Sequence, residues 1–283
     1  MRVITKVKEM QKVADELRKE GKIIGVVPTM GYLHEGHLSL IRIAKEKSDV
    51  VITTIFVNPL QFAPHEDYDK YPRDFERDVG LAQSAGCDII FHPSVEEMYP
   101  ENFLTYVEVE KLTKVLEGEF RPTHFRGVTT VVAKLFNITK PHIAVFGQKD
   151  AQQALIIKQM VRDLNFDIEI IVAPIVRESD GLAMSSRNVY LSESERKDAT
   201  VLYQSLKLAE KLIEEGERKP DVVISKMEEL IKSKPTAKID YIEIVDPNTL
   251  EKVEKLEEGK EYLIALAVRI GSTRLIDNTL VKI

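Results

Sequence analysis

The sequence of 283 residues has one cysteine and no tryptophan. It also has no apolar run that approaches the length of a membrane-spanning helix, about 18 residues. A single cysteine, Cys87, excludes an intrachain disulfide framework and is typical of a reducing compartment. Residues 1–21 carry charges throughout and contain no apolar segment of the kind found in signal peptides. We therefore expect a cytoplasmic protein that does not associate with membranes.

The chain also has no excess of positive charge. Its formal net charge is -6, which argues against a general nucleic-acid binder, because such a domain needs a basic face. Hydrophobic residues make up 43% and charged residues 30%, a balance that supports a large core under a well-solvated surface. Cys87 borders an apolar run, so we expect a buried core thiol and not a reactive nucleophile.

Short apolar runs alternate with helical patterns through the first 176 residues. Strands are expected at 22–29, 50–58, 88–93, 142–147 and 167–174, and helices at 7–17, 37–48, 75–86, 127–139 and 150–164. Parallel strands need crossover connections, so this alternation predicts an α/β fold with a Rossmann-like, doubly wound parallel sheet. In such a sheet, ligands bind at the carboxyl ends of the strands.

The pattern changes after Pro174. Residues 177–191 are polar and rich in serine, a long helix is expected over 191–216 with a Ser192–Glu195 capping box, and another helix over 219–233. Strands are expected at 238–246 and 262–271. The prediction is therefore a domain of residues 1–176 and a smaller α+β domain of residues 177–283 that closes over the active site, with 177–191 as a mobile joint.

The segment MGYLHEGHLSL, which follows the first expected buried strand, allows three interpretations. His34 and His37 are three residues apart, not four as on the helix of zinc proteases, and no second cluster supplies a third metal ligand. Alternatively, His37 caps the helix and His34 is exposed, although histidine is a poor cap. The interpretation that we favour is an anion site, because the free backbone N–H groups and the positive dipole end at a helix N-terminus bind phosphate.

Two further segments could bind phosphate. Lys149 and Asp150 follow the strand expected at 142–147, where a lysine can reach phosphate and an aspartate can accept from ribose hydroxyls. Ser185, Ser186 and Arg187 add two hydroxyls and a guanidinium in the polar joint, a combination suited to a polyphosphate. Each segment alone could be an ordinary solvated turn.

The strand–HxGH–helix arrangement resembles the signature of nucleotidyltransferases and class I aminoacyl-tRNA synthetases. The whole chain resembles one family of that superfamily, the pantothenate synthetases or pantoate–β-alanine ligases. The matching text is PTMGYLHEGHLSL, FVNPLQF, YPRDFERD, EGEFRPTHFRGVTTVVAKLFN, FGQKDAQQ and VRESDGLAMSSRN, in family order. The resemblance implies an ATP-dependent condensation of D-pantoate with β-alanine to pantothenate, AMP and pyrophosphate through an enzyme-bound pantoyl adenylate, with magnesium, in a homodimer.

The resemblance also implies roles for individual residues. His37 corresponds to the proton donor, Gln61 to a residue that contacts both pantoate and β-alanine, and Gln153 to a second pantoate contact. On chemical grounds, His34, His37 and Lys149 could also donate to the α-phosphate. The ATP-binding residues that it implies are Met30, Gly31, Tyr32, Leu33, His34, Glu35, Gly36, His37, Gly147, Gln148, Lys149, Asp150, Val176, Met184, Ser185, Ser186 and Arg187.

Two positions depart from the family pattern, and other functions stay possible. Gln148 stands where glutamate is common, and Thr123 where glycine is common. Arg121 and Arg126 add positive charge, a structural hydrogen bond is expected for His124, and no role is expected for the histidines at 65, 92 and 142. The rival functions are an adenylyl-forming or nucleotidyl-transferring enzyme for a different acid and a non-catalytic ATP sensor.

Overall fold

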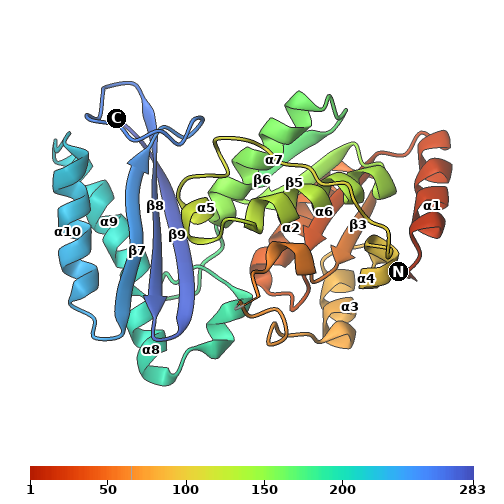
Figure 1. Ribbon diagram of the computed structural model, residues 1–283, viewed down its shortest axis with the longest axis horizontal. Coiled ribbons are helices and arrows are strands. Elements are labelled where there is room, and N and C mark those ends of the chain that lie inside the picture. The colour runs from red at the N-terminus through yellow and green to blue at the C-terminus, as the bar shows by residue number, and fades with distance from the viewer. Residues whose placement is uncertain (65) are drawn as a thin grey trace. The chain divides into compact units, whose positions relative to one another are not determined.

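The computed structural model describes residues 1–64 and 66–283, which form two compact units (Figure 1). Unit 1 comprises Met1–Thr113, Arg121–Gln148 and Gln152–Pro174. Unit 2 comprises Lys114–Phe120, Lys149–Ala151 and Ile175–Ile283. The predicted boundary at residue 176 and the predicted closing motion stay predictions. His65 lies outside the described residues.

Unit 1 contains a six-stranded sheet in which all neighbouring strands are parallel. The strand order is β1 (Arg2–Ile4), β4 (Ile89–Phe91), β3 (Val50–Ile55), β2 (Ile24–Thr29), β5 (Ile143–Gly147) and β6 (Glu169–Ala173). This order confirms the predicted doubly wound sheet, to which the short edge strand β1 is an unpredicted addition. The chain moves outward from β2 in one direction and resumes at β5 on the other side, so the topological switch point lies between β2 and β5.

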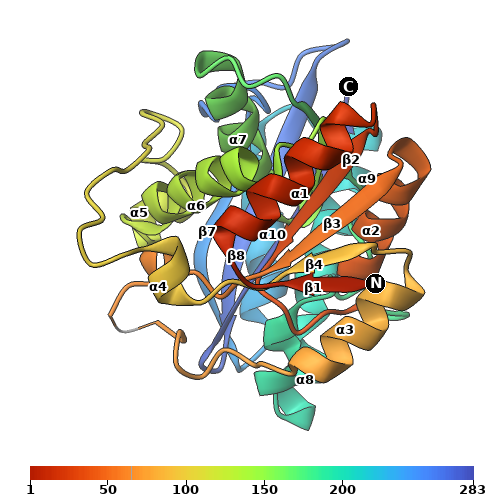
Figure 2. The same cartoon turned by 90° about the vertical axis from the view of Figure 1, so that its right-hand side faces the viewer.

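Helices cover the two faces of this sheet. On one face α1 (Val7–Lys19) packs against α6 (His124–Thr139), as Figure 2 shows, whereas α2 (Glu35–Lys47) packs on β2, β3 and β5 and contacts α3 (Phe75–Ser84). The remaining helical segments up to residue 163 are η1 (Pro59–Gln61), α4 (Val95–Met98), α5 (Glu117–Phe120), η2 (Gln148–Asp150) and α7 (Ala151–Asp163). Every helix among the described residues is too short or too polar to span a bilayer.

The core of unit 1 lies between the sheet and α2. Val27, Ile41 and Val145 are fully buried in it. Cys87 is buried in the same cluster, which confirms the predicted buried core thiol, and burial raises the pKa of that thiol. The central strands β2 and β3 are buried on both faces, as their nearly continuous apolar sequence predicted.

Unit 2 contains an antiparallel sheet of β7 (Ala237–Val245), β8 (Glu261–Ile270) and β9 (Thr273–Lys282). In Figure 1 this sheet lies beside α9 (Val201–Glu214) and α10 (Pro220–Lys232), and α10 contacts both α9 and β7. Leu206, Met227 and Ile264 are buried in the resulting core. The sequence predicted β7, β8 and α10, but it did not predict β9.

The single helix predicted over residues 191–216 is wrong, because two helices form there. They are α8 (Glu193–Ala199), opened by the predicted Ser192–Glu195 capping box, and α9, which begins at Val201. Between them the Thr200 hydroxyl donates to the Lys197 carbonyl at 2.8 Å. Side-chain bonds of this kind compete with the backbone ladder, which explains the interruption at a β-branched residue.

Candidate active site

The turn from β2 into α2 is held in a conformation that few sequences adopt. Gly31 and Tyr32 both have positive φ, +84° and +50°. The buried Asp78 carboxylate accepts from the backbone N–H groups of Tyr32 and Leu33 at 2.6 and 2.7 Å. A Cβ on Gly31 would lie 2.9 Å from Asp78 Oδ2, so glycine is needed for space as well as for its dihedral angle. Burial raises the pKa of Asp78, and the two N–H donors oppose that effect.

Both histidines of the HxGH segment cap α2. His34 is the N-cap, and its Nδ1 accepts from the Gly36 N–H at 3.2 Å. His37 Nδ1 accepts from the His34 N–H at 3.3 Å, and the ring centroids are 4.0 Å apart. An imidazole nitrogen that accepts carries no proton, so each ring is neutral with its proton on Nε2. Capping and ligand binding are therefore not alternatives, since Nδ1 makes the cap and Nε2–H is a donor.

Gln61 ends the short helix η1 after β3 and is buried. Its Nε2 lies 3.2 Å from Met30 Sδ, and its Oε1 accepts from Asn58 Nδ2 at 3.0 Å. Asn58 also donates to the Gly127 carbonyl and accepts from Tyr99. Gln61 and the β2–α2 turn, both predicted site segments, are thus brought into contact.

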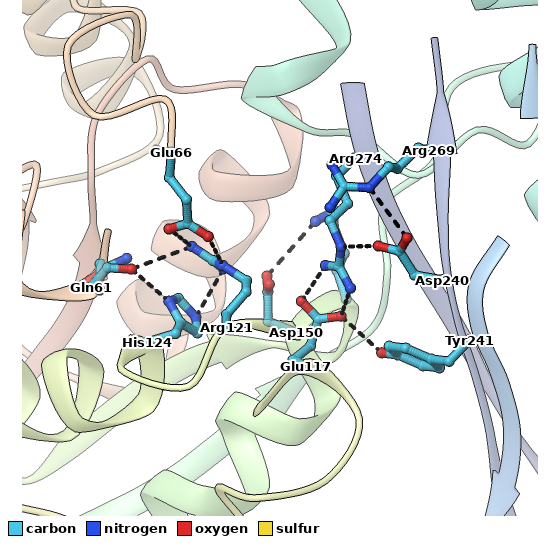
Figure 3. Close-up of polar contacts among 11 residues, drawn as sticks. Gln61, Glu66, Glu117, Arg121, His124, Asp150, Asp240, Tyr241, Arg269 and Arg274 are labelled. Carbon is cyan, nitrogen blue, oxygen red and sulfur yellow. Dashed lines mark hydrogen bonds and ion pairs between the residues drawn. The ribbon is translucent and has the colours of Figure 1, made fainter. Parts of the chain in front are cut away.

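Arg121 and His124 hold the Gln61 carbonyl, and Glu66 holds Arg121 (Figure 3). His124 Nδ1 donates to the Gln61 carbonyl at 3.0 Å, and Arg121 Nη2 donates to it at 3.3 Å. Arg121 also forms a two-point ion pair with Glu66 at 2.6 and 2.9 Å. Burial alone raises the pKa of Glu66, but Arg121, the Ala63 N–H and His124 together outweigh it, and the net pKa is below the ordinary value. The predicted structural hydrogen bond of His124 is confirmed.

The segment after β5 carries the predicted Lys149 and Asp150. Gly147 ends the strand, and residues 148–150 form the 3-10 helix η2 before α7. Lys149 Nζ lies 4.0 Å from Asp150 Oδ2, and the Lys149 carbonyl accepts from Asn278 Nδ2 at 3.0 Å. Gln153 is half-buried in the first turn of α7.

Residues 176–187 form a short pinned loop in unit 2. The Met184 N–H donates to the Val176 carbonyl at 3.0 Å, and Arg177 and Ala183 form an isolated β-bridge. Ser185 caps the 3-10 helix η3 (Ser186–Tyr190) by accepting from the Arg187 N–H at 3.3 Å. Two predicted nucleotide segments of the sequence, Val176 and Met184 onward, are therefore paired.

A second polar cluster in unit 2 surrounds Glu117 of α5. Arg274 Nη1 and Nη2 donate to the Glu117 carboxylate at 2.6 and 2.8 Å, and Arg274 Nε donates to Asp240 at 2.7 Å, as Figure 3 shows. Tyr241 Oη donates to Glu117 at 3.0 Å. Burial, followed by the Glu117 charge, raises the pKa of Tyr241. The cluster ties α5 to β7 and β9.

Sequence reasoning missed three residues that shape the site, Asp78, Asn58 and Glu66. Asp78 stabilises a turn that is remote in the sequence, whereas Asn58 and Glu66 accept from the nearby N–H groups of Leu60 and Ala63 and reach Gly127 and Arg121 only through the fold. In the sequence they were marked only by their place in YPRDFERD (Asp78), in NPLQF (Asn58) or shortly after NPLQF (Glu66). Among the described residues, no group of three or more His, Cys, Asp or Glu side chains is arranged to hold a metal ion. The pair His34–His37 is thus not part of a protein-built metal cage in the part of the chain that the structure describes.

Comparisons with known proteins agree over nearly the whole chain. The family model described as pantoate-beta-alanine ligase matches residues 2–280. Pantothenate synthetase of Caldicellulosiruptor bescii is 61% identical over 282 residues, which cover 100% of this chain and 99% of that protein. The crystal structure of pantothenate synthetase from Thermus thermophilus has a TM-score of 0.92 at 46% identity and 99% coverage of each chain. The structure of pantoate-beta-alanine ligase from Francisella tularensis, complexed with beta-gamma ATP and beta-alanine, has a TM-score of 0.82 at 37% identity, covering 99% of this chain and 97% of that one.

Proposed function

Because the chain belongs to the pantoate–β-alanine ligase family, an enzyme family that forms pantothenate, we propose that it activates D-pantoate with ATP as a bound pantoyl adenylate. In the first step the pantoate carboxylate oxygen attacks the α-phosphorus and pyrophosphate leaves. In the second step the β-alanine amine attacks the acyl carbon, and AMP leaves as pantothenate forms. The relative that is complexed with beta-gamma ATP and beta-alanine supports ATP and β-alanine as substrates.

The proposed donors to the phosphates are His34, His37 and Lys149. Charge accumulates on the phosphoryl oxygens during the displacement, and fixed donors aimed at those oxygens stabilise it most. The capped rings support this role because their Nδ1 atoms are already occupied by backbone N–H groups, so their donors are the Nε2–H groups. We assign ATP contacts to the following segments: Met30–His37, Gly147–Asp150, Val176 and Met184–Arg187.

Departing pyrophosphate is assigned to Ser185, Ser186 and Arg187, which combine hydroxyl donors with a permanent positive charge. Gln61 is assigned to both pantoate and β-alanine, and Gln153 to pantoate. A neutral amide can orient a hydroxyl or a carboxylate without forming a strong ion pair, which would lower the nucleophilicity of the pantoate carboxylate. The rigid surroundings of Gln61, held through both its side chain and its carbonyl, support a positioning role for it.

Magnesium is proposed to accompany ATP. The described residues provide no protein cage for it, which fits a cation that is bound mainly by phosphate oxygens and water. It would neutralise phosphate charge, and no residue is assigned to it. We also propose a homodimer, the commonest closed assembly of soluble proteins, which a mass measurement by light scattering would test.

The observation that carries this proposal is the doubly capped start of α2, placed directly after a buried strand at the switch point. Its test is isotope exchange between pyrophosphate and ATP. We expect exchange to require pantoate and magnesium but not β-alanine, and complete turnover to yield AMP and pantothenate in equal amounts. Exchange that requires β-alanine, or ADP as product, would contradict the adenylate. AMP formation with another acid would favour the first rival, and ATP binding without turnover would favour a sensor.

A further inference from the structure

Two adjacent polar residues in the middle of β9 are almost completely buried. Asp277 and Asn278 are 2% and 3% exposed. Successive side chains of a strand point to opposite faces of its sheet. Leu275 and Val281, on the same side as Asp277, belong to the apolar core of unit 2. A buried carboxylate there costs free energy unless it is fully paired, so its partners indicate what the pair does.

Asp277 holds the loop that follows Val176. Its two carboxylate oxygens accept from Arg177 Nη1 and Nη2 at 2.6 and 2.9 Å. Arg177 also donates to the Gly181 carbonyl at 3.0 Å, and its guanidinium lies over the Tyr203 ring. Gly181 has a φ of +94°, and a Cβ there would lie 2.0 Å from Tyr203 Cδ1, so this close approach of the loop to α9 requires glycine.

Asn278 holds the other nucleotide segment of unit 2. Its Nδ2 donates to the Lys149 carbonyl at 3.0 Å, from the opposite face of the strand. The Asn278 N–H donates to Asp277 Oδ1 at 2.8 Å, so the two residues are also linked to each other. One rigid strand therefore carries both the segment with Lys149 and the loop between Val176 and Met184.

We propose that Asp277 and Asn278 are positioning residues that set the spacing between Lys149 and the loop of residues 176–187, so that both segments meet the same ATP molecule. This inference rests on the proposed function for the assignment of those segments to ATP. We assign neither side chain a contact with the substrate, because these side chains bond to Arg177 and to the Lys149 carbonyl. Their contribution to catalysis is the preorganisation of backbone that would otherwise have to be ordered when ATP binds.

The test replaces Asn278 by a side chain of the same branched shape that has no donor. For Asn278→Leu we expect the Kd for a non-hydrolysable ATP analogue and the KM for ATP to rise about tenfold, the ratio that corresponds to one hydrogen bond. The KM for β-alanine should stay within about twofold of the wild-type value, because that substrate is not assigned to either segment. Thr279→Val is the matched control, because it removes the neighbouring hydrogen bond to Glu210 and leaves both nucleotide segments untouched.

Calorimetric binding keeps this test independent of turnover. If the wild type binds the analogue but forms no pantothenate, the proposed function fails and the binding comparison still decides the inference. Asn278→Asp, which keeps the shape and presents an acceptor to the Lys149 carbonyl, replaces the leucine variant if that variant does not fold. An unchanged Kd in a folded variant, or an equal rise in the Thr279→Val control, would overturn the proposal.

Discussion

At the scale of single residues, the protonation state of the site histidines follows from their backbone partners. His34 and His37 accept at Nδ1, whereas His124 donates from Nδ1 to a carbonyl. The same residue type thus has opposite tautomers in two places of unit 1. Only the first arrangement puts the proton of a neutral ring on Nε2, the form that a phosphate oxygen requires there.

This difference predicts a separation of stability from activity at His37. In His37→Asn the amide oxygen can replace Nδ1 and keep the cap, but it cannot reach the position of Nε2. We expect the melting temperature to stay near the wild-type value and pantoate-dependent exchange to fall at least about a hundredfold, the usual cost of one oxyanion donor. His37→Ala should lose both functions, with a stability loss of about 1 kcal/mol from the missing cap.

Calorimetry and exchange assays on the two variants check this prediction. An asparagine variant that retains a large part of the wild-type exchange rate would remove the His37 ring from phosphoryl transfer. A melting temperature as low as that of the alanine variant would show that the amide does not replace the cap.

At the scale of elements, the central strand pair β2–β5 depends on a histidine for which the sequence predicted no role. His142 Nδ1 accepts from the Ile24 N–H at 3.0 Å, and the backbone N–H of His142 donates to the Ile24 carbonyl at 2.8 Å. Burial, followed by the Arg18 charge, lowers the pKa of His142 below the ordinary 6.5. Protonation would remove the acceptor and with it one bond at the start of the pair.

The loss of this bond on protonation of His142 should make the stability of the protein depend on pH. A depressed pKa means that this contribution to stability is present above pH 6.5 and is lost as the pH falls through the folded-state pKa. We expect the wild-type melting temperature to drop more between about pH 8 and about pH 5 than that of His142→Asn, which keeps an acceptor that does not titrate. His92→Asn is the control, because His92 Nδ1 donates to the Ile55 carbonyl and both ring forms can do so. Equal slopes for His142→Asn and the wild type would contradict the prediction.

The same scale shows which elements the sequence could predict. Buried parallel strands and their helices have a clear apolar period, and the site segments follow directly from the strand ends. The strand β9 was missed because Asp277 and Asn278, both poor strand formers, interrupt its apolar pattern. Their hydrogen-bond partners, Arg177 and the Lys149 carbonyl, are about 100 residues or more away in the sequence. Asp78 and Asn58 were missed for a related reason, since their long-range bonds, from the Tyr32 and Leu33 N–H groups to Asp78 and from Asn58 to the Gly127 carbonyl, become visible only in the fold.

At the scale of the whole molecule, the net charge of -6 must be reconciled with anionic substrates. ATP and pantoate are both negative, and the proposed site offers few cations, chiefly Lys149 and Arg187. A cation that arrives with the nucleotide would reduce this repulsion without a protein-built cage, in line with the absence of a three-ligand cluster among the described residues. A tightly held structural metal would require the opposite, a set of preformed ligands.

The two cases differ in what chelation does to the protein. We expect the chain, after EDTA treatment and desalting, to keep its melting temperature and to contain much less than one metal ion per chain by mass spectrometry. Magnesium should then restore turnover fully, because it is supplied with ATP. A zinc ion retained in stoichiometric amount, with a lower melting temperature after its removal, would instead assign His34 and His37 to a metal. The apo protein thus provides the decisive measurement, because its stability reports on a resident ion before any substrate is added.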